Sequence, residues 1–523
     1  MQFTDLIEFA KSSLASLTDT VLKGNSTNQV ATVAGIPLIY FLYKFILYPV
    51  YLTPLRRVPG PKLKNPFLMA GHMREVIADE PGTSYVRWSK ELNGAKVFKY
   101  YRLFNEPAVI ILSPSAIKRV LGTHAHLYGK SSIPWKMLHR FFGPGLLTVD
   151  GDVHKRQRAV ANPAFRLKNL TALIPIFLES AQELASSWNQ THLSLQESAQ
   201  IDVAAEMSKP TLDIIGRAGF GYEFNSVAGG ESPLSYWMNT LLGQFQFKNV
   251  LVDSLLPFVK WIVPAEWKRH VDVRDAQAKA FATALRIVEE RRRELQSGGG
   301  SVDAPDLLTL FLKANTEAEV KNRLSDKELM AQVLTFLLAG HETTSVSLGY
   351  LFDFLAKNPS VQQKLRNEVI TEMETVAHTP SDEYIISTTT YLDAVCKESL
   401  RLAPAAPVFH RICLQDDVLD GYKIPKGTFI GMSPLAMHLS EEYWGPDAAV
   451  FKPERWTTNT ASAGSNDAYD EIGRPYGSYL PFSMGTRNCI GAKFAMMEMK
   501  SIVAVLLTMK AVPGILLKLK RVE

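Results

Sequence analysis

A cysteine near the carboxyl-terminal end of the chain lies among residues that suit metal binding by a thiolate. Residues 482–491 read FSMGTRNCIG, with the cysteine at position 489. Gly485 permits a tight turn that residues with a side chain resist, and Arg487 offers a planar cation for a buried carboxylate. Phe482 can cover the sulfur with its ring. A free cysteine is often only a small buried hydrophobe, but four further suitable residues at fixed spacing favour a ligand at Cys489.

A second run with chemical potential is AGHETT at residues 339–344, in the middle of a predicted helix. Glycine costs a helix interior about 1 kcal/mol relative to alanine, so Gly340 needs a reason, and with Ala339 it would leave room beside a flat ligand. Glu342 and Thr343 supply a carboxylate and a hydroxyl for proton delivery. A zinc-protease helix is excluded because its second histidine is absent, although a threonine that only bonds to its own helix remains an alternative.

Together the two runs resemble the signatures of the cytochrome P450 family. Residues 482–491 match its haem-binding pattern F-x-x-G-x-R-x-C-x-G, and residues 339–343 match its oxygen-activation pattern A/G-G-x-D/E-T. The resemblance implies haem b with Cys489 as the axial ligand of the iron, and Thr343 and Glu342 as catalytic residues that deliver protons. The further cofactor contacts that it implies in these runs are Phe482, Gly485, Arg487, Ala339 and Gly340.

The same resemblance implies a structural triad. Glu398 and Arg401 stand three residues apart on a predicted helix, where they can pair, and residues 453–456 read PERW. The family joins such a pair to an arginine of a P-E-R-F-like segment, so Glu398, Arg401 and Arg455 are expected to fix the loop before the cysteine. A tryptophan replaces the commoner phenylalanine of that segment. Apolar neighbours predict at least partial burial of the pair.

Three further residues are expected near the haem propionates. Arg411 matches a propionate-binding arginine of many family members, and Arg158 matches the arginine of the family's W-x-x-x-R helix. His154 stands where that helix has its tryptophan, and an imidazole there can still donate a hydrogen bond to a propionate. The sequence therefore departs from the family pattern at this one contact.

The helix that must position residues 339–344 has clear ends. Ser325 and Glu328 predict a capping box at its start, and the helical pattern continues to Lys357, just before Asn358-Pro359. At 1.5 Å per residue this helix is roughly 50 Å long, enough to cross a domain. Its segment Val333–Ala339 is apolar apart from Thr335, which predicts burial.

The other predicted elements are mainly helical. We expect a helix over 83–92, strands over 96–104 and 108–112 with a turn at Asn105-Glu106, and a long amphipathic helix over 265–296. Helical patterns dominate after Ser113. The predicted fold class is mainly α, a cytochrome P450 fold with a small β region and an N-terminal transmembrane helix.

Composition excludes several classes of protein. The chain has 523 residues, of which 46% are hydrophobic and 21% charged, so neither disorder nor a multi-span membrane protein is indicated. The net charge of +5 is spread along the chain and predicts no nucleic-acid partner. The chain has only three cysteines, Cys396, Cys413 and Cys489, which argues against a disulfide framework.

The amino-terminal part predicts a membrane anchor. Residues 1–29 form a leader, and residues 30–52 are an apolar run broken by Lys44 and two prolines, long enough to span a bilayer. Residues 53–64 form a basic, proline-rich hinge with Pro59-Gly60-Pro61. More basic residues follow the anchor than precede it, so we expect a single-pass protein of the endoplasmic reticulum with its catalytic domain, residues 65–523, in the cytosol.

The segment after the cysteine is shorter than the family usually carries. Thirty-four residues follow Cys489, and the last predicted helix ends near Met509. Family members generally add a β-hairpin whose tip closes the substrate pocket. We therefore expect a shortened hairpin.

The resemblance implies a microsomal haem-thiolate monooxygenase of fungal type that oxidises a lipophilic small molecule. The segments expected to line the pocket, residues 130–145, 220–263, 333–343 and 405–409, are largely apolar, which suits a terpenoid, sterol, fatty acid or polyketide of secondary metabolism. Electrons would come from NADPH through cytochrome P450 reductase, with cytochrome b5 as a further partner. Two alternatives stay open: a peroxide-using or isomerising haem-thiolate enzyme, and a non-catalytic haem-binding remnant.

Overall fold

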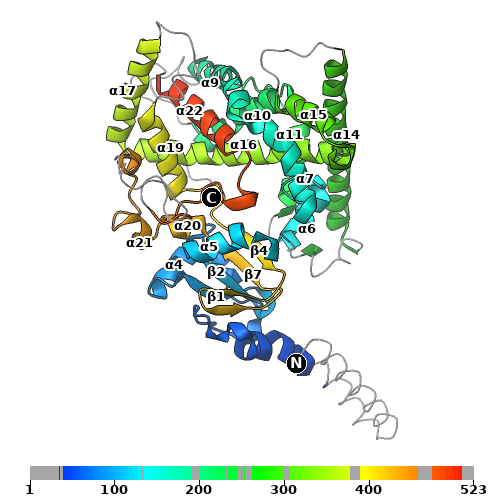
Figure 1. Ribbon diagram of the computed structural model, residues 1–523, viewed down its shortest axis with the longest axis vertical. Helices are drawn as coiled ribbons and strands as arrows, with labels where there is room; N and C mark the ends of the chain where they lie inside the picture. The colour runs from blue at the N-terminus through cyan, green and yellow to red at the C-terminus, as the bar shows by residue number, and fades with distance from the viewer. Residues whose placement is uncertain are drawn as a thin grey trace. The chain divides into compact units, whose positions relative to one another are not determined.

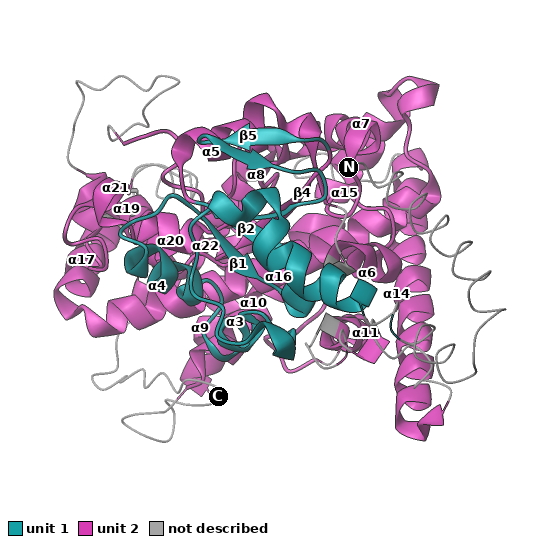
Figure 2. Ribbon diagram, turned by 90° about the horizontal axis from the view of Figure 1, so that it is seen from below, with its two compact units in different colours: residues 1–111, 415–431 teal, residues 112–414, 432–523 magenta. Residues whose placement is uncertain are grey.

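The computed structural model describes residue 35 and residues 39–130, 133–190, 201–230, 232–245, 249, 252–253, 262–297, 306–376, 389–457 and 474–508. The chain divides into two compact units, coloured separately in Figure 2. Unit 1 comprises residues 1–111 and 415–431, and unit 2 comprises residues 112–414 and 432–523. The residues predicted to carry the chemistry all belong to unit 2.

Unit 1 contains the predicted hairpin. Strand β1 (Val97–Tyr101) pairs antiparallel with β2 (Pro107–Ile111), with Val97 opposite Ile111. The predicted turn is confirmed, because Phe104 and Asn105 adopt left-handed backbone angles, φ 60° and 56°. The first strand ends three residues earlier than expected, since a 3-10 turn, η4 (Leu103–Asn105), intervenes.

The remaining elements of unit 1 are short. Helix α4 (Thr83–Glu91) agrees with the predicted helix, and β5 (Asp417–Leu419) pairs antiparallel with β6 (Tyr422–Ile424). Strand β7 (Phe429–Met432) stands at the boundary of the two units in sequence. The other elements are η1 (Tyr43–Leu52), η2 (Pro54–Arg57), η3 (Pro66–Leu68) and α3 (Met73–Ala78).

The predicted anchor, residues 30–52, falls partly outside the described residues, which here include position 35 and positions 39–52. Among the helices that the structure describes, none combines the length and the apolar character needed to cross a membrane. The predicted hinge is packed on β1, because the N–H of Lys99 donates to the Pro59 carbonyl over 2.7 Å. A Cβ at Gly60 would lie 2.3 Å from the Lys99 carbonyl oxygen, so this close approach requires glycine.

Unit 2 is mainly helical and is organised around α16 (Asp326–Lys357), which contacts α10, α14, α19 and α22 (Figure 1). The capping box is confirmed: the Glu328 N–H lies 3.4 Å from Ser325 Oγ, and the Ser325 N–H lies 3.0 Å from Glu328 Oε2. Val333, Leu334 and Leu337 are buried as predicted, whereas Ala339 is exposed.

The helices around α16 are long and enclose one core. Helix α14 (Pro264–Gln296) confirms the predicted long helix within a residue of its start. The larger helices beside these two are α9 (Ile174–Trp188), α10 (Val203–Phe220), α11 (Pro233–Leu242), α15 (Leu307–Glu317), α17 (Pro359–Val376), α19 (Thr390–Leu402) and α22 (Ala492–Thr508). Apolar side chains from most of them form the core of this unit.

Shorter elements of unit 2 carry most of the predicted site. Strand β3 (Tyr128–Gly129) pairs antiparallel with β4 (Phe409–Cys413). The short helices before α16 are α5 (Pro114–Lys118), η5 (Arg119–Thr123), η6 (Ala125–Leu127), α6 (Ile133–Phe142), α7 (Gly151–Ala161), η7 (Asn162–Phe165), α8 (Leu167–Thr171), η9 (Gly243–Phe245) and η10 (Val320–Asn322). Those after it are α20 (Pro434–His438), α21 (Glu441–Trp444), η11 (Pro453–Trp456) and η12 (Gly485–Arg487).

Candidate active site

Cys489 lies on a tight loop between the turn η12 and helix α22. Its backbone N–H donates to the carbonyl of Phe482 over 2.9 Å, which closes the loop. Gly485 has a φ of +71°, and a Cβ there would lie 2.0 Å from the carbonyl oxygen of Leu121 in η5. The turn therefore requires glycine, for the reason that the sequence predicts.

The surroundings of Cys489 act on its thiol in opposite directions. The residue is exposed, yet nearby protein partly desolvates the sulfur and raises the pKa of the thiol. The Gly491 backbone N–H and the charge of Arg158 lower this pKa. The Arg158 guanidinium is held at the loop by Asn488, over 2.7 Å to its carbonyl oxygen and 2.8 Å to Oδ1. A cation and an N–H beside the sulfur stabilise the thiolate, which is the form that binds a metal.

Four basic residues gather near this loop: Lys130, His154, Arg411 and Arg487, which we call the cation cluster. Lys130, His154 and Arg411 are buried. Burial, together with the nearby charge of Arg487, lowers the pKa of Arg411 to about 10. Burial and the positive charges of the other cluster members, together with Arg158, lower the pKa of His154 to about 3. His154 is therefore neutral at physiological pH and can act as a hydrogen-bond donor.

One carboxylate, Asp150, faces the cation cluster. Its Oδ1 lies 2.5 Å from Arg487 Nη2, and its Oδ2 accepts from the Lys130 backbone N–H over 2.7 Å. Asp150 occupies the N-cap position of α7 but makes no side-chain cap there, because its oxygens are used by the cluster. The carboxylate that Arg487 contacts in the structure is thus a residue of the chain, whereas the sequence predicts a propionate.

The cation cluster fits a dianionic group such as haem b. Among the described residues, three cations and a neutral imidazole face one carboxylate, and burial together with the mutual repulsion of the cations lowers the pKa values of Lys130 and Arg411. Buried cations are stable when anions pair with them. Two propionates would supply this negative charge beside the thiol of Cys489. The residues present therefore suit a haem, and their individual contacts to it stay predictions.

The predicted proton-delivery residues lie side by side on α16. Thr343 donates from its hydroxyl to the Ala339 carbonyl over 2.7 Å, as expected for a threonine that bonds to its own helix. Its own carbonyl accepts from Ser347 Oγ over 2.8 Å. Thr343 and Glu342 are both exposed. Partial desolvation raises the pKa of Glu342, so its carboxyl group holds a proton more readily than a carboxyl in water.

Gly340 lies against a neighbouring helix. A Cβ at this position would lie 2.8 Å from Cδ1 and 2.9 Å from Cγ1 of Ile215 on α10. The glycine therefore permits the close packing of α10 against α16, a reason that the sequence does not show. The expected contact of Gly340 with a flat ligand stays a prediction.

The structural triad is assembled as predicted, and its burial is complete. Arg401 donates to both carboxylate oxygens of Glu398 over 2.8 Å each, and the Nε of Arg455 lies 3.1 Å from Glu398 Oε1. The side chains of Glu398 and Arg401 are 0% exposed. The tryptophan that replaces the family's phenylalanine adds a contact, since Trp456 Nε1 donates to Glu398 Oε2 over 2.9 Å.

No sequence motif identifies three residues that the structure places in this region: Lys130, Asp150 and His438. Lys130 was only part of a segment expected to line the substrate pocket, and Asp150 reads as an ordinary residue before a helix. His438 is buried behind the triad. Each acquires its role from partners that are distant in sequence. Parts of the other expected pocket segments, among them residues 246–248 and 254–261, lie outside the described residues.

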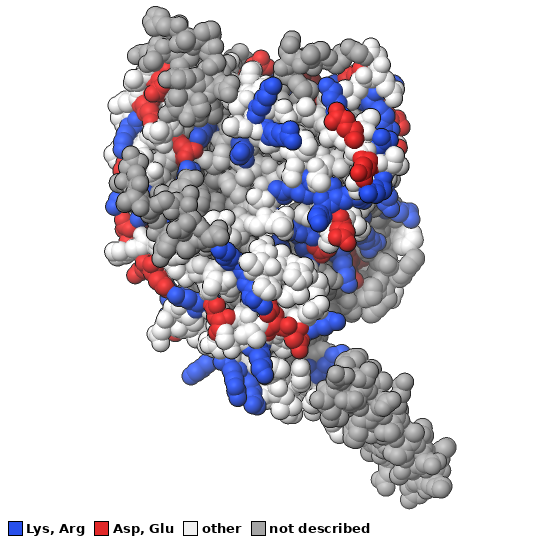
Figure 3. Space-filling model, viewed as in Figure 1, with Lys and Arg blue, Asp and Glu red and all other residues white. Residues whose placement is uncertain are grey.

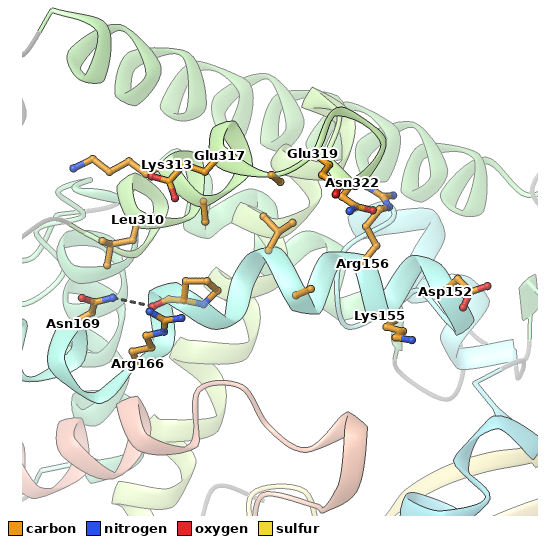
Figure 4. Close-up of a pocket in the computed structure, with 15 residues that line it drawn as sticks. Asp152, Lys155, Arg156, Arg166, Asn169, Leu310, Lys313, Glu317, Glu319 and Asn322 are labelled. Atoms are coloured by element: carbon orange, nitrogen blue, oxygen red, sulfur yellow. Dashed lines mark hydrogen bonds between the residues drawn. The ribbon is translucent and has the colours of Figure 1, made fainter.

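A surface cavity of about 790 Å³ lies between α7 and α15 (Figure 4). Its lining includes Lys155, Arg166 and Lys313 as well as Asp152 and Glu317, but neither Cys489 nor Thr343. This cavity is therefore not the substrate pocket. On the face drawn in Figure 3, lysine and arginine side chains gather over this part of unit 2, with acidic side chains among them.

The resemblance to the family also implies a basic surface on the cysteine side, formed by Lys155, Arg156, Arg166, Lys168, Lys493 and Lys500. In the structure this surface is smaller than expected. Lys155, Arg166, Lys168 and Lys493 are exposed. Lys500, in contrast, has a side chain that is 13% exposed and pairs with Asp393 over 2.5 Å. Arg156 is paired with Glu328. The last two residues are thus engaged inside unit 2, because carboxylates from other helices reach them.

Comparisons with known proteins agree with the motifs and the fold. The family model for cytochrome P450 matches residues 59–509. The chain is 31% identical to cytochrome P450 monooxygenase 205 of Postia placenta, over 91% of this chain and 90% of that protein. It is 30% identical to cytochrome P450 monooxygenase sphH of Aspergillus fumigatus, over 91% and 87%, and 29% identical to ganoderic acid synthetase CYP5150L8 of Ganoderma lucidum, over 92% of both.

Among solved structures, the crystal structure of the cytochrome P450DA heme domain resembles the chain with a TM-score of 0.71. The match covers 86% of this chain and 90% of that one at 24% identity, and it shows the fold. The family match over residues 59–509 and the fungal relatives also establish the family and the type of enzyme. The chain belongs to the cytochrome P450 family and is a monooxygenase.

Proposed function

We propose that this monooxygenase holds haem b through Cys489 and inserts one oxygen atom of O₂ into a lipophilic small molecule. The observation that carries the proposal is the cation cluster beside the cysteine loop. Within the described residues, Asp150 is the one carboxylate placed against Lys130, Arg411 and Arg487. A haem would account for both the cysteine loop and the cation cluster, because its iron binds the thiolate and its two propionates pair with the cations. The expected contacts of Phe482, Ala339, Arg158 and His154 belong to the same proposal.

Bound haem would supply the activation of O₂, which the Cys489 thiolate would favour by donating electron density. The chain supplies binding and proton delivery. Arg411, Arg487 and Lys130 would pair with the propionates, and His154 would donate a hydrogen bond from its neutral ring. Glu342 takes up a proton from solvent and passes it on, because partial desolvation raises its pKa towards the operating pH. Thr343 Oγ1 orients that proton when it turns from the Ala339 carbonyl.

The substrate proposal rests on apolar character and on one relative. Most core residues of α16 before Ala339 are apolar, with Gln332 and Thr335 as the buried polar exceptions, and this suits a terpenoid, sterol, fatty acid or polyketide. One relative is named ganoderic acid synthetase, so compounds related to ganoderic acid belong in the first substrate panel. Secondary metabolism is the proposed setting.

The electron source and the location complete the proposal. NADPH electrons would arrive through cytochrome P450 reductase, with cytochrome b5 as a second donor, at the exposed residues Lys155, Arg166, Lys168 and Lys493. An acidic partner surface would be attracted to them. We further propose that residues 30–52 anchor the protein in the endoplasmic reticulum membrane with the catalytic domain in the cytosol.

The carbon monoxide difference spectrum of the reduced protein tests the ligand. Membrane-expressed wild type should give the red-shifted Soret band of a thiolate–CO complex, and Cys489→Ala should lose it. Cys396→Ala is the matched control, because Cys396 is a buried free cysteine of α19 and should leave the band in place. A band that survives in Cys489→Ala would refute the ligand assignment.

Turnover then separates the function from its alternatives. Oxidation of a panel compound that needs both NADPH and reductase supports the proposed reaction. Turnover with peroxide alone would favour the peroxide-using alternative. Stable haem without turnover under either condition would favour the non-catalytic alternative.

A further inference from the structure

His438, the last residue of α20, is a fully buried histidine between the structural triad and the cysteine loop. It is 0% exposed, and its ring lies near those of Tyr479 and Trp444, with centroids 5.3 Å and 6.2 Å away. Such a position allows no bulk water at the imidazole. Both ring nitrogens must therefore find partners in the protein.

Each nitrogen of His438 has one backbone partner. Nδ1 lies 2.9 Å from the carbonyl oxygen of Arg401, so it must donate to that oxygen. Nε2 accepts from the backbone N–H of Leu480 over 2.8 Å. These two bonds fix a neutral ring with its proton on Nδ1, because an imidazolium has no lone pair to accept the second bond. Burial agrees with this state, since it lowers the pKa of His438 to about 3.

The link between His438 and Arg401 is reciprocal. The Arg401 guanidinium donates through Nη1 to the His438 carbonyl over 2.7 Å, while the His438 ring donates to the Arg401 carbonyl. The same guanidinium holds Glu398 of the triad. His438 is thus fixed to α19 by both its backbone and its side chain, and its remaining nitrogen is directed at Leu480.

Leu480 begins the segment that leads to the cysteine. Its carbonyl accepts from the Ser483 N–H over 3.1 Å, and the Phe482 carbonyl accepts from the Cys489 N–H over 2.9 Å. Tyr479 adds a parallel tie to α19, since its hydroxyl donates to the Lys397 carbonyl over 3.0 Å. A continuous set of hydrogen bonds therefore leads from the triad through the imidazole to the cysteine loop.

We propose that His438 is a positioning residue for the thiolate: its imidazole joins the backbone of Arg401 to that of Leu480 and so sets the position of Cys489. The triad itself contacts the residues before the loop through η11 and α21. His438 adds a direct link, because its ring bonds to Arg401 of the triad and to Leu480 of the loop segment. The proposal rests on Cys489 being the haem ligand. It assigns to His438 a role in keeping the thiolate bound, distinct from a general contribution to stability.

Two substitutions separate the two bonds of His438. In His438→Asn the amide nitrogen takes the place of Nδ1 and can still donate to Arg401, but Leu480 loses its acceptor. In His438→Gln the longer side chain brings an amide oxygen to the place of Nε2, so Leu480 keeps its acceptor and the bond to Arg401 is lost. The readout is the ratio of the thiolate–CO Soret band to the band of neutral thiol or histidine ligation, at equal haem content.

We expect His438→Asn to raise the fraction with a displaced thiolate about tenfold or more, because a buried N–H without a partner favours movement of its loop. His438→Gln should keep most of the thiolate band. His72→Gln is the control, since His72 is also buried and accepts the Tyr101 N–H at its Nδ1 over 3.0 Å, a position that the longer amide side chain leaves without an acceptor, but His72 belongs to unit 1. It should lower the midpoint of unfolding without changing the band ratio.

Equal band ratios in His438→Asn and His438→Gln, or the same change in His72→Gln, would overturn the proposal in favour of a general structural role. If His438→Asn yields no folded protein, Tyr479→Phe removes only the parallel tie to Lys397 and should produce a smaller increase of the displaced form. No change in that variant would count against the proposal. Persistence of the thiolate band in Cys489→Ala would instead refute the ligand assignment on which it rests.

Discussion

Replacing Glu398 by glutamine should remove the charge around which the triad is built. The carboxylate accepts two bonds from Arg401, one from Arg455, one from Trp456 and one from the Lys452 backbone N–H. The Arg401 side chain is 0% exposed and that of Arg455 is 6% exposed. Glu398→Gln leaves two buried guanidinium groups without their shared anion and turns an amide donor towards other donors.

The size of the effect follows from that burial. Removing one partner of a buried ion pair costs about 3–5 kcal/mol of unfolding free energy. With the steep denaturant dependence of a large protein, this lowers the midpoint of urea denaturation by about 1 M. Tryptophan fluorescence and the Soret band of the holoenzyme, followed in the same titration, measure the shift. The thiolate–CO band should weaken before the tryptophan signal changes, because the loop depends on the triad.

Glu454→Gln is the matched control. Glu454 is in the neighbouring segment η11, and its side chain is 41% exposed where it meets Lys364. Exposed pairs contribute about 0–1 kcal/mol, so the control should move the midpoint little. A shift of the Glu398→Gln midpoint no larger than that of Glu454→Gln would refute the reasoning that burial makes the triad strong.

Two further predictions address the packing of α16 and the pH dependence of stability. Gly340→Ala should lower the unfolding free energy by about 1–3 kcal/mol through overpacking against Ile215. Adding Ile215→Val should restore only part of this loss, because Cγ1 as well as Cδ1 approaches the new Cβ. Equal stability of Gly340→Ala and wild type in urea titrations would show that α10 moves aside freely. For His154, the folded pKa of about 3 lies below the ordinary value of 6.5, so the unfolded chain binds a proton first and stability falls as the pH drops from 6.5 towards 3. His154→Gln should make this decline less steep by up to about 1.4 kcal/mol per pH unit, and unchanged slopes in denaturation at pH 4–7 would contradict it.

Local chemistry in the sequence predicted the elements that carry the site. The capping box of Ser325 and Glu328 located the start of α16, and Asn358-Pro359 located its end, because both signals act within one turn of helix. The cysteine loop was equally predictable, since the left-handed backbone at Gly485 is a demand of the turn itself. The E-x-x-R spacing likewise brought Glu398 and Arg401 together on one face of α19.

Tertiary structure decided what these elements meet. Gly340 faces Ile215 because α10 lies against that side of α16, a fact that no pattern within α16 contains. Lys500 is withdrawn from the surface by Asp393, which arrives from another helix. The sequence identified a small residue at Gly340 and a cation at Lys500, but not the side chain that each of them meets.

The sequence alone determined the thiolate loop, the proton-delivery run and the helix that carries it, because each depends on bonds between residues close in the chain. The cation cluster and the role of His438 depend on residues from position 130 to position 487 that meet only when the helices pack. The charges of the cluster and the ring nitrogens of His438 find their partners in residues that are distant in sequence. Long-range packing therefore decided how Cys489 is held, while local sequence decided that it would be presented at all.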